Sequence, residues 1–187
     1  MAFTVVYDAN ILYPAPLRDL LVRLGMTGVV RVKWTEQILD EVFRNILKDR
    51  PDLSEDRLAR TRALMNAAIR DVLVYGYEPL VAALELPDPD DRHVLAAAIR
   101  CGAQSIITHN LKDFPAQKLE PLGIEAVSPD EFVLDLLDLA PGAVVGVLKE
   151  QQASLKTPPM SLDELLDTLE NNGLVRSVAE AREMLRT

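Results

Sequence analysis

The sequence predicts an α/β protein in which a central parallel sheet lies between two layers of helices, with a small helical extension at the C-terminus. Short apolar runs alternate with helical patterns over the first 140 residues, as in a three-layer α/β/α domain. Three of these runs are largely apolar, which favours strands covered on both faces: Phe3–Tyr7, Ser105–Thr108 and Ile124–Val127. A length of 187 residues suits one domain plus an appendage. We therefore assign residues 1–140 to the α/β domain and residues 141–187 to the extension.

The elements after the first strand follow from capping and periodicity. Leu17–Leu24 is predicted as a helix, and Val29–Trp34 as a short second strand or an extended connection. Thr35 then fits the N-cap of a strongly periodic helix. Ser54 starts a further helix that extends to Arg70.

The middle of the chain contains the clearest helix. Val72–Tyr75 is predicted as a strand and Leu80–Leu84 as a short helix. Asp88 fits the N-cap of the next helix, because a proline follows it at the first helical position. Gly102 fits the end of that helix.

The C-terminal third is predicted to be helical. Ser128 opens a helix with a capping box, and Gly142–Leu155 follows as a second helix. Residues 156–160 form a linker. Ser161–Asn171 and Ser177–Leu185 are two short helices, and each begins with a capping box.

Charge and composition narrow the functional classes. Twenty Lys and Arg against 29 Asp and Glu give a net charge of −9, which opposes non-specific binding of nucleic acid. Basic residues nevertheless concentrate between residues 44 and 70, either as a solvated helical face or as a local basic surface. The single cysteine, Cys101, cannot form an internal disulfide, and the sequence shows neither a membrane-length apolar run nor a signal peptide. We therefore expect a cytoplasmic protein.

Two predicted strand ends carry acids, amides or a hydroxyl. Asp8 and Asn10 follow the first strand, and Thr108, Asn110 and Asp113 end or follow the strand at 105–108. The carboxyl ends of parallel strands meet at one edge of a sheet, where α/β proteins bind ligands. Each group could instead form an ordinary turn in which the side chain bonds the backbone.

Two further acids come from helices. Asp91 precedes the apolar residues of its helix by three, four and seven positions and so shares their face, whereas Asp90 lies about 100° away. A carboxylate on a buried face is costly unless it is paired, hydrogen bonded or metal bound, although Asp91 could also bond the free N–H groups of the helix. Glu41 lies on a polar face beside Arg44, so it is functional only if that face looks onto the site.

Four acids are thus candidates for one site: Asp8, Glu41, Asp91 and Asp113. Carboxylate oxygens suit a hard cation such as Mg²⁺ or Mn²⁺, which also relieves their mutual repulsion. Such a site can activate water and stabilise phosphoryl charge in phosphodiester hydrolysis. Basic side chains on the rim would hold the rest of a nucleic acid, and the candidates are Arg44, Lys48, Arg57, Arg60 and Arg62.

Four motifs occur in this order along the chain: VVYDANIL, WTEQILDEVFRNI, LPDPDDRHVLAAAI and IITHNLKDFP. In order and spacing the chain resembles PIN-domain ribonucleases, and closely the VapC toxin type, over residues 1 to about 135. The resemblance implies a PIN-like fold in which the four acids hold Mg²⁺ or Mn²⁺. Thr108 and Asn110 match the polar residues beside the last acid, and Asn110 could share the role of Asp113. The tail resembles the extension of a longer VapC-like subgroup.

The resemblance also implies partners: structured RNA, often transfer RNA, as substrate, a VapB-like antitoxin, and often a second copy of the chain. Other readings of the residues stay open. A phosphatase with an aspartate nucleophile would need a second acid where the chain has Asn10. A phosphorylated receiver domain fits less well. A catalytically silent binding module is disfavoured because all four acids are present.

Several other side chains are interpreted as structural. His93 lies about 160° from the apolar face of its helix and is expected to be exposed. His109 is interpreted as a loop residue near the site, and Cys101 as a core residue. Trp34 and Tyr13 could stack on bases, but we assign both to packing.

Overall fold

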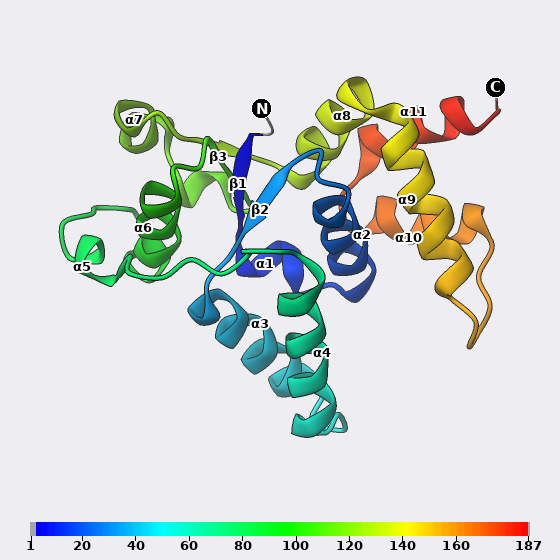
Figure 1. Ribbon diagram of the computed structural model, residues 1–187, viewed down its shortest axis with the longest axis horizontal. Helices are drawn as coiled ribbons and strands as arrows, with labels where there is room; N and C mark the ends of the chain where they lie inside the picture. The colour runs from blue at the N-terminus through cyan, green and yellow to red at the C-terminus, as the bar shows by residue number, and fades with distance from the viewer. Residues whose placement is uncertain (1–2, 187) are drawn as a thin grey trace.

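The computed structural model describes residues 3–186 and has the expected α/β/α architecture (Figure 1). Within these residues, four parallel strands form one sheet in the order β2-β1-β3-β4. In the register of the sheet, Val6 lies opposite Lys33 on one side and Ile106 on the other. The two central strands, β1 and β3, are buried along their whole length, as their apolar runs predict. The strands are β1 (Thr4–Tyr7), β2 (Arg31–Lys33), β3 (Ser105–Ile107) and β4 (Glu125–Val127).

The strand predicted at Val72–Tyr75 is wrong. Within the described residues, this segment makes an isolated parallel bridge between Trp34 and Leu73 and is not a strand of the sheet. Asp71 and Gly76 have φ values of 54° and 72°, so left-handed turns interrupt the backbone on both sides. The extended stretch is therefore too short to continue the sheet.

Helices cover both faces of the sheet. α6 (Arg92–Cys101) packs on one face, and α2 (Ala15–Met26) lies on the other together with α8 (Pro129–Leu139) (Figure 1). Phe132 of α8 packs edge-on against Tyr7 of β1, with 5.9 Å between the ring centroids. Two short helices lie on the α6 side of the sheet, α5 (Glu78–Val81) and α7 (Ala116–Leu119). α5 begins two residues before the helix predicted at Leu80–Leu84.

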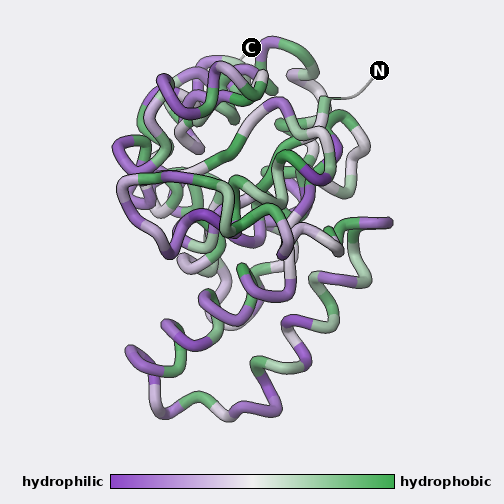
Figure 2. Tube along the Cα trace, turned by 90° about the vertical axis from the view of Figure 1, so that its left-hand side faces the viewer, coloured by the Kyte–Doolittle hydropathy of each residue, from purple (hydrophilic) through white to green (hydrophobic). Residues whose placement is uncertain are grey.

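Three helices lie beyond the carboxyl ends of β1 and β2. α3 and α4 form a hairpin that projects away from the body of the molecule in both views (Figures 1 and 2). α4 buries Leu58 and Met65 and presents most of its other side chains to solvent. The bounds are α1 (Ala9–Leu12), α3 (Glu36–Asp49) and α4 (Glu55–Ala68).

The predicted caps are confirmed for most helices. The side chains of Thr35, Ser54 and Ser128 each accept a hydrogen bond from the N–H of the third residue of their helix. Gly102 ends α6 in the left-handed conformation. Asp88 caps a 3-10 turn, η1 (Pro89–Asp91), that leads directly into α6. α6 therefore starts later than predicted, and Asp91, the last residue of η1, is the N-cap of α6.

The C-terminal extension shares one continuous hydrophobic core with the α/β domain. Asp130 of α8 accepts hydrogen bonds from the N–H groups of Arg176 and Ser177, at 3.0 and 2.9 Å, and so caps the last helix. The capping box predicted at Ser177 is wrong, since this residue is buried inside the helix and its hydroxyl bonds Asp130. The capping box at Ser161 is confirmed. The helices are α9 (Pro141–Ser154), α10 (Leu162–Asn171) and α11 (Val175–Arg186).

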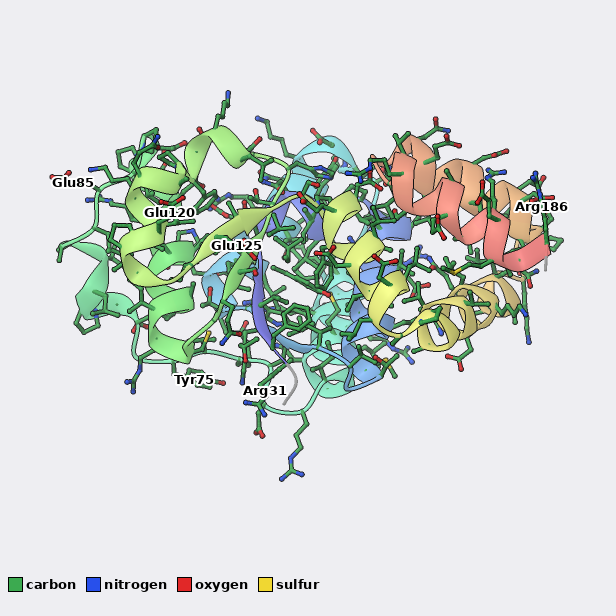
Figure 3. The ribbon with its side chains drawn as sticks, turned by 90° about the horizontal axis from the view of Figure 1, so that it is seen from above. Arg31, Tyr75, Glu85, Glu120, Glu125 and Arg186 are labelled. Carbon is green, nitrogen blue, oxygen red and sulfur yellow. The ribbon has the colours of Figure 1, made fainter. Side chains whose placement is uncertain are left out.

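Seen from above, the extension forms one end of the long axis of the molecule (Figure 3). Arg186 marks this end, and Glu85 marks the other, on the side of α5 and α7. Among residues 3–186, no helix is both long and apolar enough to span a membrane.

Candidate active site

Asp8 is the rigid centre of the site. It follows β1 directly and is 4% exposed. Its Oδ1 accepts the N–H of Ala9 at 2.7 Å, and its Oδ2 accepts bonds from Thr108 Oγ1 and Asn10 Nδ2, both at 2.8 Å. Burial raises the pKa of Asp8, and the hydrogen bond from Thr108 opposes that shift. The carboxylate is therefore held in one orientation before any ligand binds.

The supporting polar residues join the ends of β1 and β3. Asn10 Nδ2 also donates to Thr108 Oγ1 at 3.0 Å, and Asn10 Oδ1 accepts the N–H of His109 at 3.0 Å. Thr108 Oγ1 in turn accepts the N–H of Asn110 at 3.0 Å. The structure thus brings Asp8 and Asn10 together with Thr108 and Asn110, as the strand-end argument predicts, whereas Asp113 takes no part in these bonds.

Glu41 faces this edge of the sheet from α3, and a buried histidine lies beside it. His93 Nε2 is 3.7 Å from Glu41 Oε1. The prediction that His93 is exposed is wrong, because its side chain is 4% exposed. α6 is buried on a second face as well, where Ala96 and Ala97 pack against Tyr77. Within the described residues, neither ring nitrogen of His93 has a hydrogen-bond partner.

Asp91 lies at the end of η1, partly buried and without a side-chain capping bond. Burial raises its pKa to about 7, and the charge of Asp8 adds to the shift. The charges of Glu41 and Asp113 act in the same direction. Asp90, the alternative candidate on the same turn, is exposed. The structure therefore favours Asp91 as the residue that belongs to the site.

These side chains line a pocket of about 380 Å³ at the carboxyl edge of the sheet. Asp113 is not among the lining residues; it lies in the 3-10 turn η2 (Leu111–Asp113) and acts on Asp91 through its charge. Tyr13, Asn45 and Asp49 also line the pocket and were not predicted as site residues. Asn45 and Asp49 lie four and eight residues after Glu41 on the same helix, and this spacing was a usable signal. The lining residues are Asp8, Ala9, Asn10, Tyr13, Glu41, Asn45, Asp49, Asp91 and Asn110.

The donor chemistry of the pocket fits a hard cation. Asp8, Glu41 and Asp91 offer carboxylate oxygens from three different elements, and they line one open cavity. Within residues 3–186, however, no three His, Cys, Asp or Glu side chains are arranged to hold one ion as they stand. An ion would therefore have to draw the acids together, and metal binding stays a prediction.

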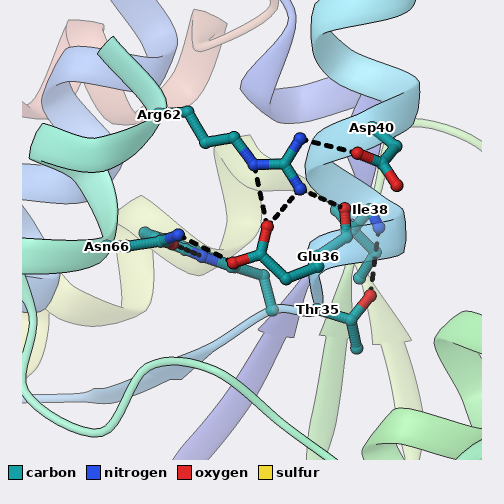
Figure 4. A network of polar contacts seen from close by, with 7 residues as sticks. Thr35, Glu36, Ile38, Asp40, Arg62 and Asn66 are labelled. Carbon is teal, nitrogen blue, oxygen red and sulfur yellow. Dashed lines mark hydrogen bonds and ion pairs between the residues drawn. The ribbon is translucent and has the colours of Figure 1, made fainter. Parts of the chain in front are cut away.

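One of the five predicted RNA-binding residues is already engaged within the protein. Arg62 of α4 pairs with Glu36 and with Asp40 of α3, and Glu36 also accepts a bond from Asn66 (Figure 4). These bonds join the two arms of the hairpin, so we now assign Arg62 a structural role. The other four side chains are exposed: Arg44, Lys48, Arg57 and Arg60.

Comparison with known families agrees with this geometry. The match to the PIN domain family spans residues 4–112, which is more than half of the chain, so the chain belongs to that family. Residues 129–183 match the VapC50 C-terminal domain. The predicted resemblance to a VapC-type PIN domain with an extension is thus confirmed.

A curated relative gives the same picture. The chain is 44% identical over 95 residues to the protein named "Putative ribonuclease VapC50" of Mycobacterium tuberculosis. The aligned stretch is 51% of this chain and 56% of the relative, so the chain spans about half the length of that protein. No solved structure matches the chain.

Proposed function

We propose that the protein is an endoribonuclease that hydrolyses phosphodiester bonds of structured RNA, such as transfer RNA, with the help of Mg²⁺ or Mn²⁺. The observation that carries the proposal is the convergence of Asp8, Glu41 and Asp91 on one open pocket at the carboxyl edge of the sheet. The name of the relative, a ribonuclease, supports the same activity. This activity also agrees with the exposed basic residues on the neighbouring hairpin.

The acids and the polar residues beside Asp8 have separate parts in the proposed reaction. Asp8, Glu41 and Asp91 would hold the cation, and Asp113 would add negative charge from η2. The ion supplies Lewis-acid stabilisation of phosphoryl charge and activation of water when it is bound. Thr108 and Asn10 keep the Asp8 carboxylate in place, so Asp8 itself needs little reorganisation, while Glu41 and Asp91 would move toward the ion.

Membership of the family supports a proposal for the wider biological role. We propose that the protein acts in the cytoplasm as the toxin of a toxin–antitoxin pair and is silenced by a VapB-like antitoxin. A homodimer is the proposed assembly. Arg44, Lys48, Arg57 and Arg60 would contact RNA phosphates along the hairpin.

The test is cleavage of a total transfer-RNA pool by the purified protein. Discrete fragments should appear with Mg²⁺ or Mn²⁺, disappear with chelator, and disappear in Asp8→Asn. Asp90→Asn is the matched control, because it removes an exposed acid from the same turn as Asp91 and should cleave like the parent. Wild-type cleavage by Asp8→Asn would contradict the proposed site. No cleavage of any RNA would favour a silent binding module.

A further inference from the structure

The pocket extends outward beyond the acids, along one face of α3. Glu41, Asn45 and Asp49 follow one another at intervals of four residues, so their side chains form one stripe on the helix. Tyr13, at the C-cap of α1, also lines the pocket and contacts Asp49, the last residue of this stripe. The cavity of about 380 Å³ therefore has an acidic inner end and an outer part lined by an aromatic ring, an amide and a single carboxylate.

The outer part is ordered by a hydrogen bond between two elements. Tyr13 Oη donates to Asp49 Oδ2 at 2.5 Å, which holds both the phenol ring and the carboxylate. The Asp49 carboxylate has further acceptor capacity, because each oxygen has two lone pairs. Among the described residues no hydrogen bond is recorded to Asp49 Oδ1 or from the amide of Asn45, although both side chains line the cavity.

Charge decides which part of an RNA this space can accept. A phosphate would lie near Asp49 and Glu41 and would be repelled. A base is uncharged, and its N–H groups can donate to a carboxylate. A phenol ring is a stacking platform for bases, and an amide can both donate and accept at a base edge. Arg44 and Lys48 precede Asn45 and Asp49 directly and are exposed, so the flanking phosphates have cations close by.

We propose that Tyr13, Asn45 and Asp49 form a subsite for one base next to the cleaved phosphate, and that this subsite prefers guanine. Guanine presents two adjacent donors, N1–H and the 2-amino group, to a single carboxylate, whereas the other RNA bases present fewer donors side by side. The ring of Tyr13 stacks on the base, and Asn45 bonds a second position on its edge. This inference rests on the proposed ribonuclease function and adds a base preference to it.

The first experiment maps cleavage sites in a random-sequence single-stranded RNA pool. The wild-type protein should show guanine enriched at one position beside the cut. Asp49→Asn should reduce that enrichment by about 10-fold, because one bidentate contact discriminates bases by that order. Tyr13→Ala should raise KM more than it lowers kcat, and Tyr13→Phe should lie between Tyr13→Ala and the wild type.

Two matched controls test whether these effects are specific. Asp56→Asn removes an exposed carboxylate from the first turn of α4, outside the pocket. Tyr75→Phe removes a hydroxyl from a tyrosine that is 68% exposed and also outside it. Both should keep the wild-type cleavage profile. An unchanged guanine preference in Asp49→Asn, or no base preference in the wild type, would overturn the subsite while leaving the nuclease function intact.

A binding measurement tests the guanine subsite even if the protein cleaves no RNA. Fluorescent RNA pentamers that contain either guanosine or inosine are titrated against the wild-type protein in chelator. Inosine lacks the 2-amino group, so its pentamer should bind several-fold more weakly, and Asp49→Asn should bind both pentamers equally. Equal affinity of the wild type for both would refute the inference. A clear difference together with no RNA cleavage would refute the proposed enzyme function alone.

Discussion

Replacing Asp91 by asparagine is expected to stabilise the protein in neutral or alkaline buffer without added metal. The pKa of this carboxyl is raised from 3.8 to about 7 by burial and by the charge of neighbours, of which Asp8 is the strongest. Ionising Asp91 therefore costs free energy in the folded state but not in the unfolded chain. The cost is absent below about pH 4, grows as the pH rises, and is complete above about pH 7. Asparagine has nearly the same shape and removes the charge.

The size of the effect follows from the shift. At 1.36 kcal/mol for each pKa unit, the upper limit is about 4 kcal/mol. Because Asp91 is only partly buried, solvent screening reduces this figure to about 1–2 kcal/mol. A protein of this size gains about 2–4 °C in melting temperature for each kcal/mol. The predicted rise is thus roughly 2–8 °C near pH 8 and close to zero near pH 4.

The assay is urea and thermal unfolding of the wild type and of Asp91→Asn across this pH range in chelator. Asp90→Asn, on the same turn but exposed, controls for the general loss of one negative charge and should gain much less. A gain in stability that does not depend on pH would refute the reasoning, because it would not come from ionisation. A loss of stability near pH 8 would refute it as well.

Four further predictions concern individual side chains outside the acidic cluster. Asp130→Ala should lower the free energy of unfolding by about 1–2 kcal/mol in urea titrations, because α11 loses its cap; an unchanged midpoint would contradict this role. Arg62→Gln should lower stability by about 1 kcal/mol and leave RNA affinity unchanged. Replacing both Arg57 and Arg60 by glutamine should leave stability unchanged and weaken RNA binding, reducing its salt slope, measured by fluorescence anisotropy, by about 1.4–1.8. His93→Phe should keep or raise the free energy of unfolding in urea titrations, since it removes two buried nitrogens without hydrogen-bond partners; a clear loss of stability would contradict this.

Much of the fold was predictable because its signals are local. Apolar runs mark the buried strands, and Thr35 and Ser54 mark helix starts by chemistry that needs no tertiary information. The misses have a common cause. The exposed position predicted for His93 assumed that α6 has one buried face, but the segment containing Tyr77 covers a second. Which side chains cover a helix is a property of the folded chain.

The site residues likewise divide into those that the sequence predicts and those whose contacts depend on tertiary packing. The topology of a parallel sheet predicts that Asp8 and Thr108 meet, and they bond at 2.8 Å. The pairing of Arg62 with Glu36 depends on how α3 and α4 pack against each other, so the basic run alone could not reveal it. Asn45 could have been found, because it lies one turn from Glu41 on the same helix.

The extension packs against the carboxyl edge of the sheet. The loop after β3 is held on one side by Asn10, whose Oδ1 accepts the N–H of His109. On the other side lies the turn between α10 and α11, where a Cβ at Gly173 would be 3.1 Å from the imidazole of His109. With φ at 101°, this turn favours glycine, and the close approach favours it again. The cap that Asp130 gives to α11 fixes the helix that follows the turn. The position of the loop that carries Thr108 and Asn110 thus depends on residues more than 60 positions later in the sequence, and on packing that the first 140 residues do not supply alone.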